Sequence, residues 1–319
     1  VSLVIVGIII RLAVVFITKS HIYPELFEYE GVVNNLLSGN GFLYDNTKFQ
    51  LNYYAAIHPL FTFLCAGIYI LFNHSFLVME IFQIFISVAT GYLIYKIGEL
   101  IFNKRVGTIA AGLTIFHPGL IIYSTTKIMS PVIDTFFFVL VAYWILKTRL
   151  TLRIRDFILL GVFIGLGTLA RGTIIIYLPI VILYYFFVIP SQRGVIFKKL
   201  CVTSIIILLI LSPWWLRNYL IFRQPVYMTT ESMGYVLWVG FNENATGTLY
   251  ASNGKTQWEE APKKLKEMVW SKKNELEQQN IFRREAVNFI VKNPLRSSML
   301  YLKRLFYFWW FTPTQGLFY

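Results

Sequence analysis

Charged residues are scarce in this sequence. Asp, Glu, Lys and Arg make up 14% of its 319 residues, whereas soluble domains carry about 25%. An ordinary soluble globular domain is therefore excluded. Cysteine is scarce as well, because only Cys65 and Cys201 are present, both in apolar segments and without a CxxC or metal-ligand spacing. Neither a disulfide framework nor a cysteine-based zinc site is expected.

Apolar runs take the place of the missing charge. Hydrophobic residues reach 56%, and the mean hydropathy is +0.60. The runs are about 14–20 residues long, roughly what an apolar helix needs to cross a hydrocarbon core about 30 Å thick. We place them at about 1–18, 57–73, 76–95, 106–123, 131–147, 157–170, 172–190 and 200–219, before a polar region and an aromatic segment from about 300. The sequence therefore predicts an all-α polytopic membrane protein.

Residues 157–190 form one apolar stretch that is too long for a single crossing. Ala170-Arg171-Gly172 interrupts it with a charge and a glycine. We therefore interpret the stretch as a hairpin of two short spans that turns at these three residues.

The sidedness of the chain depends on whether 57–73 crosses the membrane. If this segment is re-entrant or lies on the surface, three loops rich in Lys and Arg share one side, which the positive-inside rule makes cytoplasmic. These loops hold Lys96, Lys104, Arg105, Lys147, Arg149, Arg153, Arg155, Arg193, Lys198 and Lys199. The short connections on the other side hold Lys19, Lys48, Lys127 and Arg171. If 57–73 spans instead, either the polar loop 19–56 is inside or the basic loops are outside, so we prefer the surface interpretation.

This topology gives three regions. Residues 1–219 form a transmembrane module with a first outer loop at 19–75, residues 220–299 form a polar, partly helical region on the non-cytoplasmic side, and 300–319 begin a further transmembrane segment. Within the polar region, 257–293 has an amphipathic helical pattern that Asn293-Pro294 ends. The apolar ends, Val1 and Gly316–Tyr319, suggest a piece of a longer chain with further spans. The net charge of +13 is explained by membrane orientation and anionic lipid, and no nucleic-acid partner is expected.

Acidic residues cluster at the start of the first outer loop. Glu25, Glu28 and Glu30 precede or begin a short amphipathic helix that the glycines after Leu37 end. A carboxylate just above the membrane can serve as a general base or hold a divalent cation. The alternative is that these carboxylates only complement the dipole of a helix N-terminus.

Motifs along nearly the whole chain resemble those of one enzyme group. They are Glu25-Leu-Phe-Glu-Tyr29, Leu36-Leu-Ser-Gly-Asn-Gly-Phe42, His58-Pro-Leu-Phe61, Ser212-Pro-Trp-Trp-Leu-Arg-Asn-Tyr219, Leu237-Trp238 and Asn293-Pro294. In order and spacing they are similar to those of the GT-C glycosyltransferases of the family 39-like group, related to protein O-mannosyltransferases and the aminoarabinose transferases of lipid A. That family usually carries an Asp four residues before the Tyr, where this chain has Glu25.

The resemblance implies a GT-C-like transmembrane bundle with juxtamembrane helices in the first outer loop. It also implies a multi-pass protein of the plasma (inner) membrane that moves a sugar from a polyprenyl-phosphate donor to an acceptor hydroxyl, with inversion, on the non-cytoplasmic face. The acceptor is a lipid, a glycan or a protein.

For catalysis, the matching residue is Glu25, with Glu28 as the second choice. The residues that would bind the donor phosphate are Arg217, Lys127, Arg171 and His58. Each of these four can also be an ordinary interfacial side chain. A divalent metal is an open alternative, although the loop at 124–130 lacks the acidic residue frequent in the family, and the nearest acid is Asp134.

Two other functions stay open from the sequence. A transporter or flippase of lipid-linked glycans fits the composition, but it should show charges or broken helices in several spans and two matching halves. Here Arg11 is the one strong charge near mid-span, either functional or paired with Glu80. An inactive relative is the other alternative, because Glu replaces the usual Asp. Neither the sugar nor the acceptor can be read from the sequence.

Overall fold

The computed structural model describes residues 2–188, 193–230 and 234–309. The chain divides into two compact units. The first unit comprises Val1–Phe42 and His58–Met228, and the second unit comprises Leu43–Ile57 and Thr229–Tyr319. Part of the predicted first outer loop, residues 43–57, thus groups with the C-terminal region. Val1 and residues 189–192, 231–233 and 310–319, including Gly316–Tyr319, lie outside the described residues.

The first unit is almost entirely helical. Its helices are α1 (Ser2–Thr18), α2 (Glu28–Leu37), α3 (Pro59–Leu71), α4 (Phe76–Ile101), α5 (Lys104–Ile115), α6 (Pro118–Thr125), α7 (Pro131–Thr151), α8 (Ile154–Ala170), the 3-10 helix η1 (Gly172–Ile176), α9 (Tyr177–Val188) and α10 (Arg193–Phe222). Two short strands, β1 (Glu25–Leu26) and β4 (Lys127–Ile128), pair in parallel. The all-α class predicted from the apolar runs is confirmed.

Three of the described helices, α4, α7 and α10, are long and apolar enough to cross a membrane. The run predicted as one span at 106–123 is broken, because α5 ends at Ile115 and α6 restarts at Pro118 with a bend of 52°. Proline has no backbone N–H to donate and is favoured in the first turn of a helix, so a new helix begins at Pro118 after the break at His117. Together α5 and α6 make a fourth, broken span or a re-entrant element.

Three described apolar segments are shorter than these spans. They are helix α1, helix α3 and the segment Gly172–Phe187. At 1.5 Å per residue, α3 is about 20 Å long, less than the hydrocarbon thickness, which agrees with the surface or re-entrant interpretation of 57–73. Helix α1 and Gly172–Phe187, which were predicted as spans, are also below the length of the three spanning helices. The predicted hairpin turn is confirmed, because α8 ends at Ala170 and η1 begins at Gly172.

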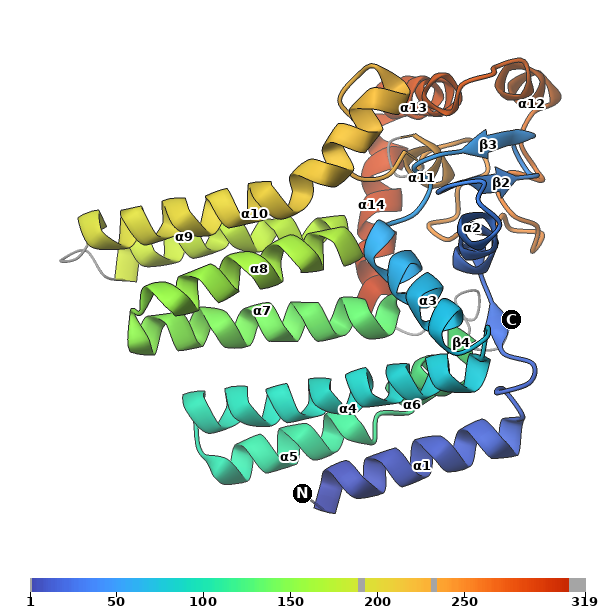
Figure 1. The fold of residues 1–319 in the computed structure, drawn as a ribbon. Helices are drawn as coiled ribbons and strands as arrows, with labels where there is room; N and C mark the ends of the chain where they lie inside the picture. The colour runs from blue at the N-terminus through green and yellow to red at the C-terminus, as the bar shows by residue number, and fades with distance from the viewer. Residues whose placement is uncertain (1, 189–192, 231–233, 310–319) are drawn as a thin grey trace. The chain divides into compact units, whose positions relative to one another are not determined.

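The basic connections and the β1–β4 strand pair lie at opposite ends of the first-unit helices. In Figure 1, the α4–α5 and α7–α8 connections, the end of α9 and the start of α10 lie at one end of the helices, while β4 and the start of α7 lie at the other. The same view shows α3 oblique to α4 and α7. The described ends of the three basic connections therefore lie together, as the predicted topology requires.

Close helix contacts in the first unit depend on glycine. A Cβ on Gly98 of α4 would lie 2.6 Å from the Cα of Gly107 of α5, and a Cβ on Gly107 would lie 2.6 Å from the carbonyl oxygen of Tyr95. No larger residue fits at either position without moving backbone. Small residues at such contacts let the backbones of membrane helices approach and gain dispersion energy.

Arg11 is fully buried in α1 and has no acidic partner among the described residues. Its guanidinium donates to the hydroxyls of Ser124 (3.1 Å) and Ser87 (3.0 Å) and to the carbonyl oxygens of Ile115 (2.8 Å) and Gly7 (3.2 Å). Glu80 is also fully buried, but its carboxylate oxygens accept no hydrogen bond from the described residues. The ion pair considered for Arg11 and Glu80 is therefore wrong, because hydroxyls and helix carbonyls already satisfy the guanidinium.

The second unit combines a hairpin with four helices in the part of the chain that the structure describes. Its elements are β2 (Tyr44–Asn46) and β3 (Leu51–Tyr53), which pair in antiparallel fashion, and α11 (Tyr235–Gly240), α12 (Lys263–Trp270), α13 (Glu275–Lys292) and α14 (Pro294–Trp309). Its core is aromatic, with buried Phe49, Tyr53, Trp238, Trp258 and Phe282. The amphipathic pattern predicted at 257–293 forms two helices, since Asn274 caps a new helix start by accepting from the N–H of Leu276.

Candidate functional site

Two segments far apart in the sequence meet at β1 and β4. Glu25 pairs with Lys127 and Leu26 with Ile128 in parallel register, and the N–H of Glu25 donates to the carbonyl oxygen of Thr126 at 2.9 Å. Parallel pairing needs a long crossover connection, which here includes α2–α6. The predicted catalytic acid and one predicted phosphate-binding residue thus become direct neighbours.

The side chains of Glu25 and Lys127 form an ion pair of 2.6 Å. Lys127 is only 11% exposed, whereas Glu25 is 45% exposed. The ammonium group also lies 5.6 Å from the ring centroids of both Phe27 and Tyr123, within the range of a cation–π contact. The site therefore offers a cation held among aromatic rings and a carboxylate that faces outward.

A hydrogen-bonded series follows directly after β4. The hydroxyl of Tyr29 donates to Ser130 Oγ (2.9 Å), and Ser130 Oγ donates to Asp134 Oδ2 (3.0 Å). Arg171 Nη1 lies 3.7 Å from the same oxygen of Asp134. Burial raises the pKa of Tyr29 to about 12, so the phenol keeps its proton and remains a donor at physiological pH. The series connects α2, the start of α7 and the turn after α8.

His58 lies beside the Arg171-Gly172 turn. A Cβ on Gly172 would lie 3.2 Å from His58 Nε2, so glycine leaves room for the imidazole. Burial, with a smaller contribution from the nearby Arg171 charge, lowers the pKa of His58 to about 4. At neutral pH the ring is therefore uncharged and offers a hydrogen bond rather than the positive charge expected from the sequence.

Arg217 lies near the end of α10, one turn after Pro213. Its guanidinium donates to the carbonyl oxygen of Phe42 (3.0 Å) and to Asn218 Oδ1 (2.9 Å), and it lies 4.7 Å from the Trp214 ring. Trp214 Nε1 in turn donates to the carbonyl oxygen of Met228 at 3.3 Å. Stacking on an aromatic face orients the planar guanidinium, as is typical of arginines that bind phosphate.

Met228 connects this arginine to the site around His58. A Cβ on Gly172 would lie 3.3 Å from Met228 Cγ, so Met228 packs against the Arg171-Gly172 turn. Arg217, Arg171 and His58 thus belong to one continuous set of contacts in the first unit.

The other two glutamates of the first loop differ from Glu25. Glu28 is exposed at the first position of α2. The carboxylate of Glu30 already has two partners, because it accepts a hydrogen bond from Tyr69 Oη (3.1 Å) and contacts His74 Nε2 (2.7 Å). Within residues 2–188, 193–230 and 234–309, no group of three or more His, Cys, Asp or Glu side chains is arranged to hold a metal ion.

Sequence reasoning missed two features of the site. It did not predict the pairing of Glu25 with Lys127, and it named Asp134 only as the nearest acid to an expected metal position. The Ser130-Pro131 start of α7 with Asp134 one turn later was a usable signal, since residues four apart on a helix share a face. Nothing local in the sequence indicates that this face meets Tyr29.

The fold and the site together define a class of protein. It is a multi-pass helical membrane protein with an acid and several basic side chains gathered at one end of its helices. The family model of the dolichyl-phosphate-mannose-protein mannosyltransferases matches residues 57–216, and the chain belongs to this family. It is a GT-C-type membrane glycosyltransferase. No curated protein matches the sequence. The matched range includes His58, Lys127 and Arg171 and ends one residue before Arg217.

Proposed function

We propose that the chain transfers a sugar from a polyprenyl-phosphate donor to an acceptor hydroxyl on the non-cytoplasmic side of the membrane, with inversion at the sugar. The family is described by its dolichyl-phosphate-linked mannose donor, and dolichol is a polyprenol, which supports the donor class. Inverting transfer is a single displacement, so it needs a base near the acceptor and positive charge near the departing phosphate.

The observation that carries the proposal is the ion pair between Glu25 and Lys127. In the resting site each charge neutralises the other. A donor phosphate that binds Lys127 replaces the carboxylate as its partner, and Glu25 is then free to accept the proton of the acceptor hydroxyl. The base and the phosphate-binding cation would thus be prepared by the same binding event.

Arg171 and Arg217 are proposed to add charge around the phosphate, and His58 to add a hydrogen bond. Arg171 is half exposed at 52%, so its guanidinium can reach a ligand while Asp134 restrains it. Arg217 is oriented by Trp214 and by Asn218. Fixed donors of this kind stabilise charge that develops on a leaving group without reorganising.

The position of the site supports the non-cytoplasmic side. The basic connections lie at the opposite end of the first-unit helices from β4 (Figure 1). Since loops rich in Lys and Arg remain cytoplasmic, β4 and Glu25 are expected outside.

The test is transfer by the full-length protein from a panel of radiolabelled polyprenyl-phosphate sugars to cell-envelope acceptors. Wild type, Glu25→Gln and Glu28→Gln are compared in lipid vesicles. We expect a labelled covalent product with wild type and Glu28→Gln, and almost none with Glu25→Gln. Movement of labelled lipid across the bilayer without any covalent product would instead establish the flippase alternative.

A further inference from the structure

The second unit contains a pocket that the proposed transfer reaction does not use. Its volume is about 410 Å³, within the range of roughly 300–1,000 Å³ typical of small-molecule sites. It is lined by α11 and the turn after it, by one face of α12 and by one face of α13. All of these elements belong to the second unit.

The floor of the pocket is apolar and buried. Trp238, Leu265 and Phe289 line it and are only 3%, 5% and 6% exposed. Trp238 is part of the aromatic core, with its ring centroid 5.5 Å from that of Phe282. An apolar floor of this kind suits the carbon-bound hydrogens of a ring-shaped ligand.

One wall of the pocket consists of polar side chains without partners among the described residues. Glu285, Asn288 and Lys292 line the pocket from α13, spaced so that all three share a helix face. Their side chains form no hydrogen bond or ion pair within the described part of the chain. Glu285 is half-buried, so its side chain is partly shielded from solvent. Together they offer both donors and acceptors to a ligand.

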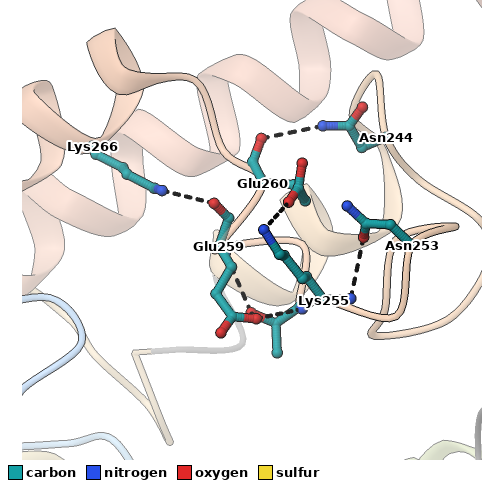
Figure 2. Close-up of polar contacts among 7 residues, drawn as sticks. Asn244, Asn253, Lys255, Glu259, Glu260 and Lys266 are labelled. Carbon is teal, nitrogen blue, oxygen red and sulfur yellow. Dashed lines mark hydrogen bonds and ion pairs between the residues drawn. The ribbon is translucent and has the colours of Figure 1, made fainter.

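The part of the lining that follows α11 is held in place by its own hydrogen bonds. Asn242 Nδ2 donates to the carbonyl oxygen of Trp238 (2.9 Å), and Asn242 Oδ1 accepts from the N–H of Asn244 (2.8 Å). Asn244 Nδ2 donates to the carbonyl oxygen of Glu260 (3.2 Å), as Figure 2 shows. Asn244 Oδ1 accepts no hydrogen bond from the residues described.

The loop behind Asn244 is fixed as well. Lys266 Nζ donates to the carbonyl oxygen of Glu259 (2.8 Å), and Lys255 lies 3.5 Å from the Glu260 carboxylate (Figure 2). The amide of Asn244 is therefore positioned before any ligand arrives. Preorganised groups of this kind reduce the entropy lost on binding.

The pocket carries charges of both signs. Glu243 and Glu285 supply two carboxylates, and Lys264 and Lys292 supply two ammonium groups. Glu243 already pairs with Arg296 at 3.2 Å, but the carboxylate of Glu285 shares a helix face with Lys292 and would repel an anion bound there. An uncharged ligand rich in hydroxyl groups can donate to the carboxylates and amide oxygens and accept from the amide and ammonium N–H groups.

We propose that this pocket is a binding site for a short uncharged glycan. The apolar floor would contact one face of a sugar ring, while Asn244, Glu285 and Asn288 would bind its hydroxyl groups. The identification of this glycan as part of the acceptor rests on the proposed function, whereas the prediction that the pocket binds a glycan does not.

The test is calorimetric titration of the full-length chain in lipid nanodiscs free of sugar-based detergent. The neutral probes are chitobiose, mannobiose and lactose, and the anionic probes are glucose 6-phosphate and inorganic phosphate. We expect at least one neutral probe to bind, and Asn288→Ala and Glu285→Gln each to weaken it by about fivefold to tenfold, the effect of losing one ligand hydrogen bond. Asn280→Ala is the matched control, because Asn280 is exposed on α13 and does not line this pocket.

Three results would overturn the proposal. The first is that no neutral probe binds at millimolar concentration. The second is that neutral probes bind equally well to wild type, Asn288→Ala and Glu285→Gln. The third is that phosphate binds, that Lys264→Ala and Lys292→Ala abolish its binding, and that neutral probes do not bind. The titration is repeated with Glu25→Gln, in which we expect binding to persist. Since no donor is present, the result is independent of whether the chain transfers a sugar.

Discussion

The carboxylate of Glu25 lies 2.6 Å from the ammonium of Lys127, although about a third of the chain separates the two residues. The parallel pairing of β1 with β4 fixes this contact through the backbone, so it does not depend on the two side chains alone. The acid of the site is therefore held beside a cation before any substrate binds.

Replacing Glu25 by Gln removes the proposed base and keeps the shape of the side chain. We expect transfer to fall by about 10²–10⁴-fold, the usual contribution of a general base. Stability should change by only about 0–1 kcal/mol, because the carboxylate is partly exposed and such ion pairs contribute little. Transfer and thermal unfolding are measured on the same preparation. Unchanged transfer by Glu25→Gln, with loss in Glu28→Gln, would move the base to Glu28.

Lys127 is predicted to act on the donor phosphate. Lys127→Met should raise KM for the polyprenyl-phosphate sugar and lower kcat, since the charge lost stabilises the leaving group in the transition state. Lys127→Arg, which keeps the charge but changes its geometry, should retain part of the activity. The two variants are compared at several donor concentrations. Full activity of Lys127→Met would contradict this role.

Tyr29 is predicted to hold the start of α7 through Ser130. Because its pKa of about 12 keeps the phenol protonated, Tyr29→Phe removes a hydrogen-bond donor at all physiological pH values. We expect a loss of about 1 kcal/mol in the free energy of unfolding, with no new dependence on pH between about 6 and 9. Tyr23→Phe is the control, because Tyr23 is 82% exposed. Equal effects of the two substitutions would contradict the role of the Tyr29–Ser130 bond.

His58 should make stability depend on pH. Its pKa is about 4 in the folded protein, against 6.5 for an unperturbed imidazole, so between these values the unfolded chain binds a proton that the native chain does not. The neutral imidazole therefore adds nothing to the free energy of unfolding below about pH 4. Its contribution grows as the pH increases and reaches about 3 kcal/mol at about pH 6.5. His58→Gln should flatten this part of the profile, measured as Tm from about pH 4 to pH 8. An identical slope in wild type and variant would show that other groups cause it.

Arg11 should be coupled to Ser87 and not to Glu80. In a double-mutant cycle, Arg11→Met with Ser87→Ala should give an interaction energy of about 1–3 kcal/mol, because the two side chains share a buried hydrogen bond. The cycle of Arg11→Met with Glu80→Gln should give a clearly smaller value, because no ion pair joins these two described residues. Unfolding in lipid micelles measures both cycles. A larger coupling to Glu80 would contradict the contacts described for Arg11.

The sequence by itself determined the local features of this protein. Hydropathy and helix signals depend on neighbouring residues, so the helices α4, α7 and α10, the turn at Arg171 and the helix after Phe27 were all predicted from it. The motifs at His58 and within Ser212–Tyr219 also indicated the family. The break between α5 and α6 was missed even though Pro118 was visible, because the apolar run masked it.

Only the tertiary structure decided how distant groups combine. The contact of Glu25 with Lys127 depends on the path of the chain through α2–α6, and the uncharged state of His58 depends on its burial beside Arg171. The same is true of Arg11, whose partners come from α4, α5 and α6. Burial and charge act through space at distances of a few ångströms, so no local pattern in the sequence encodes them.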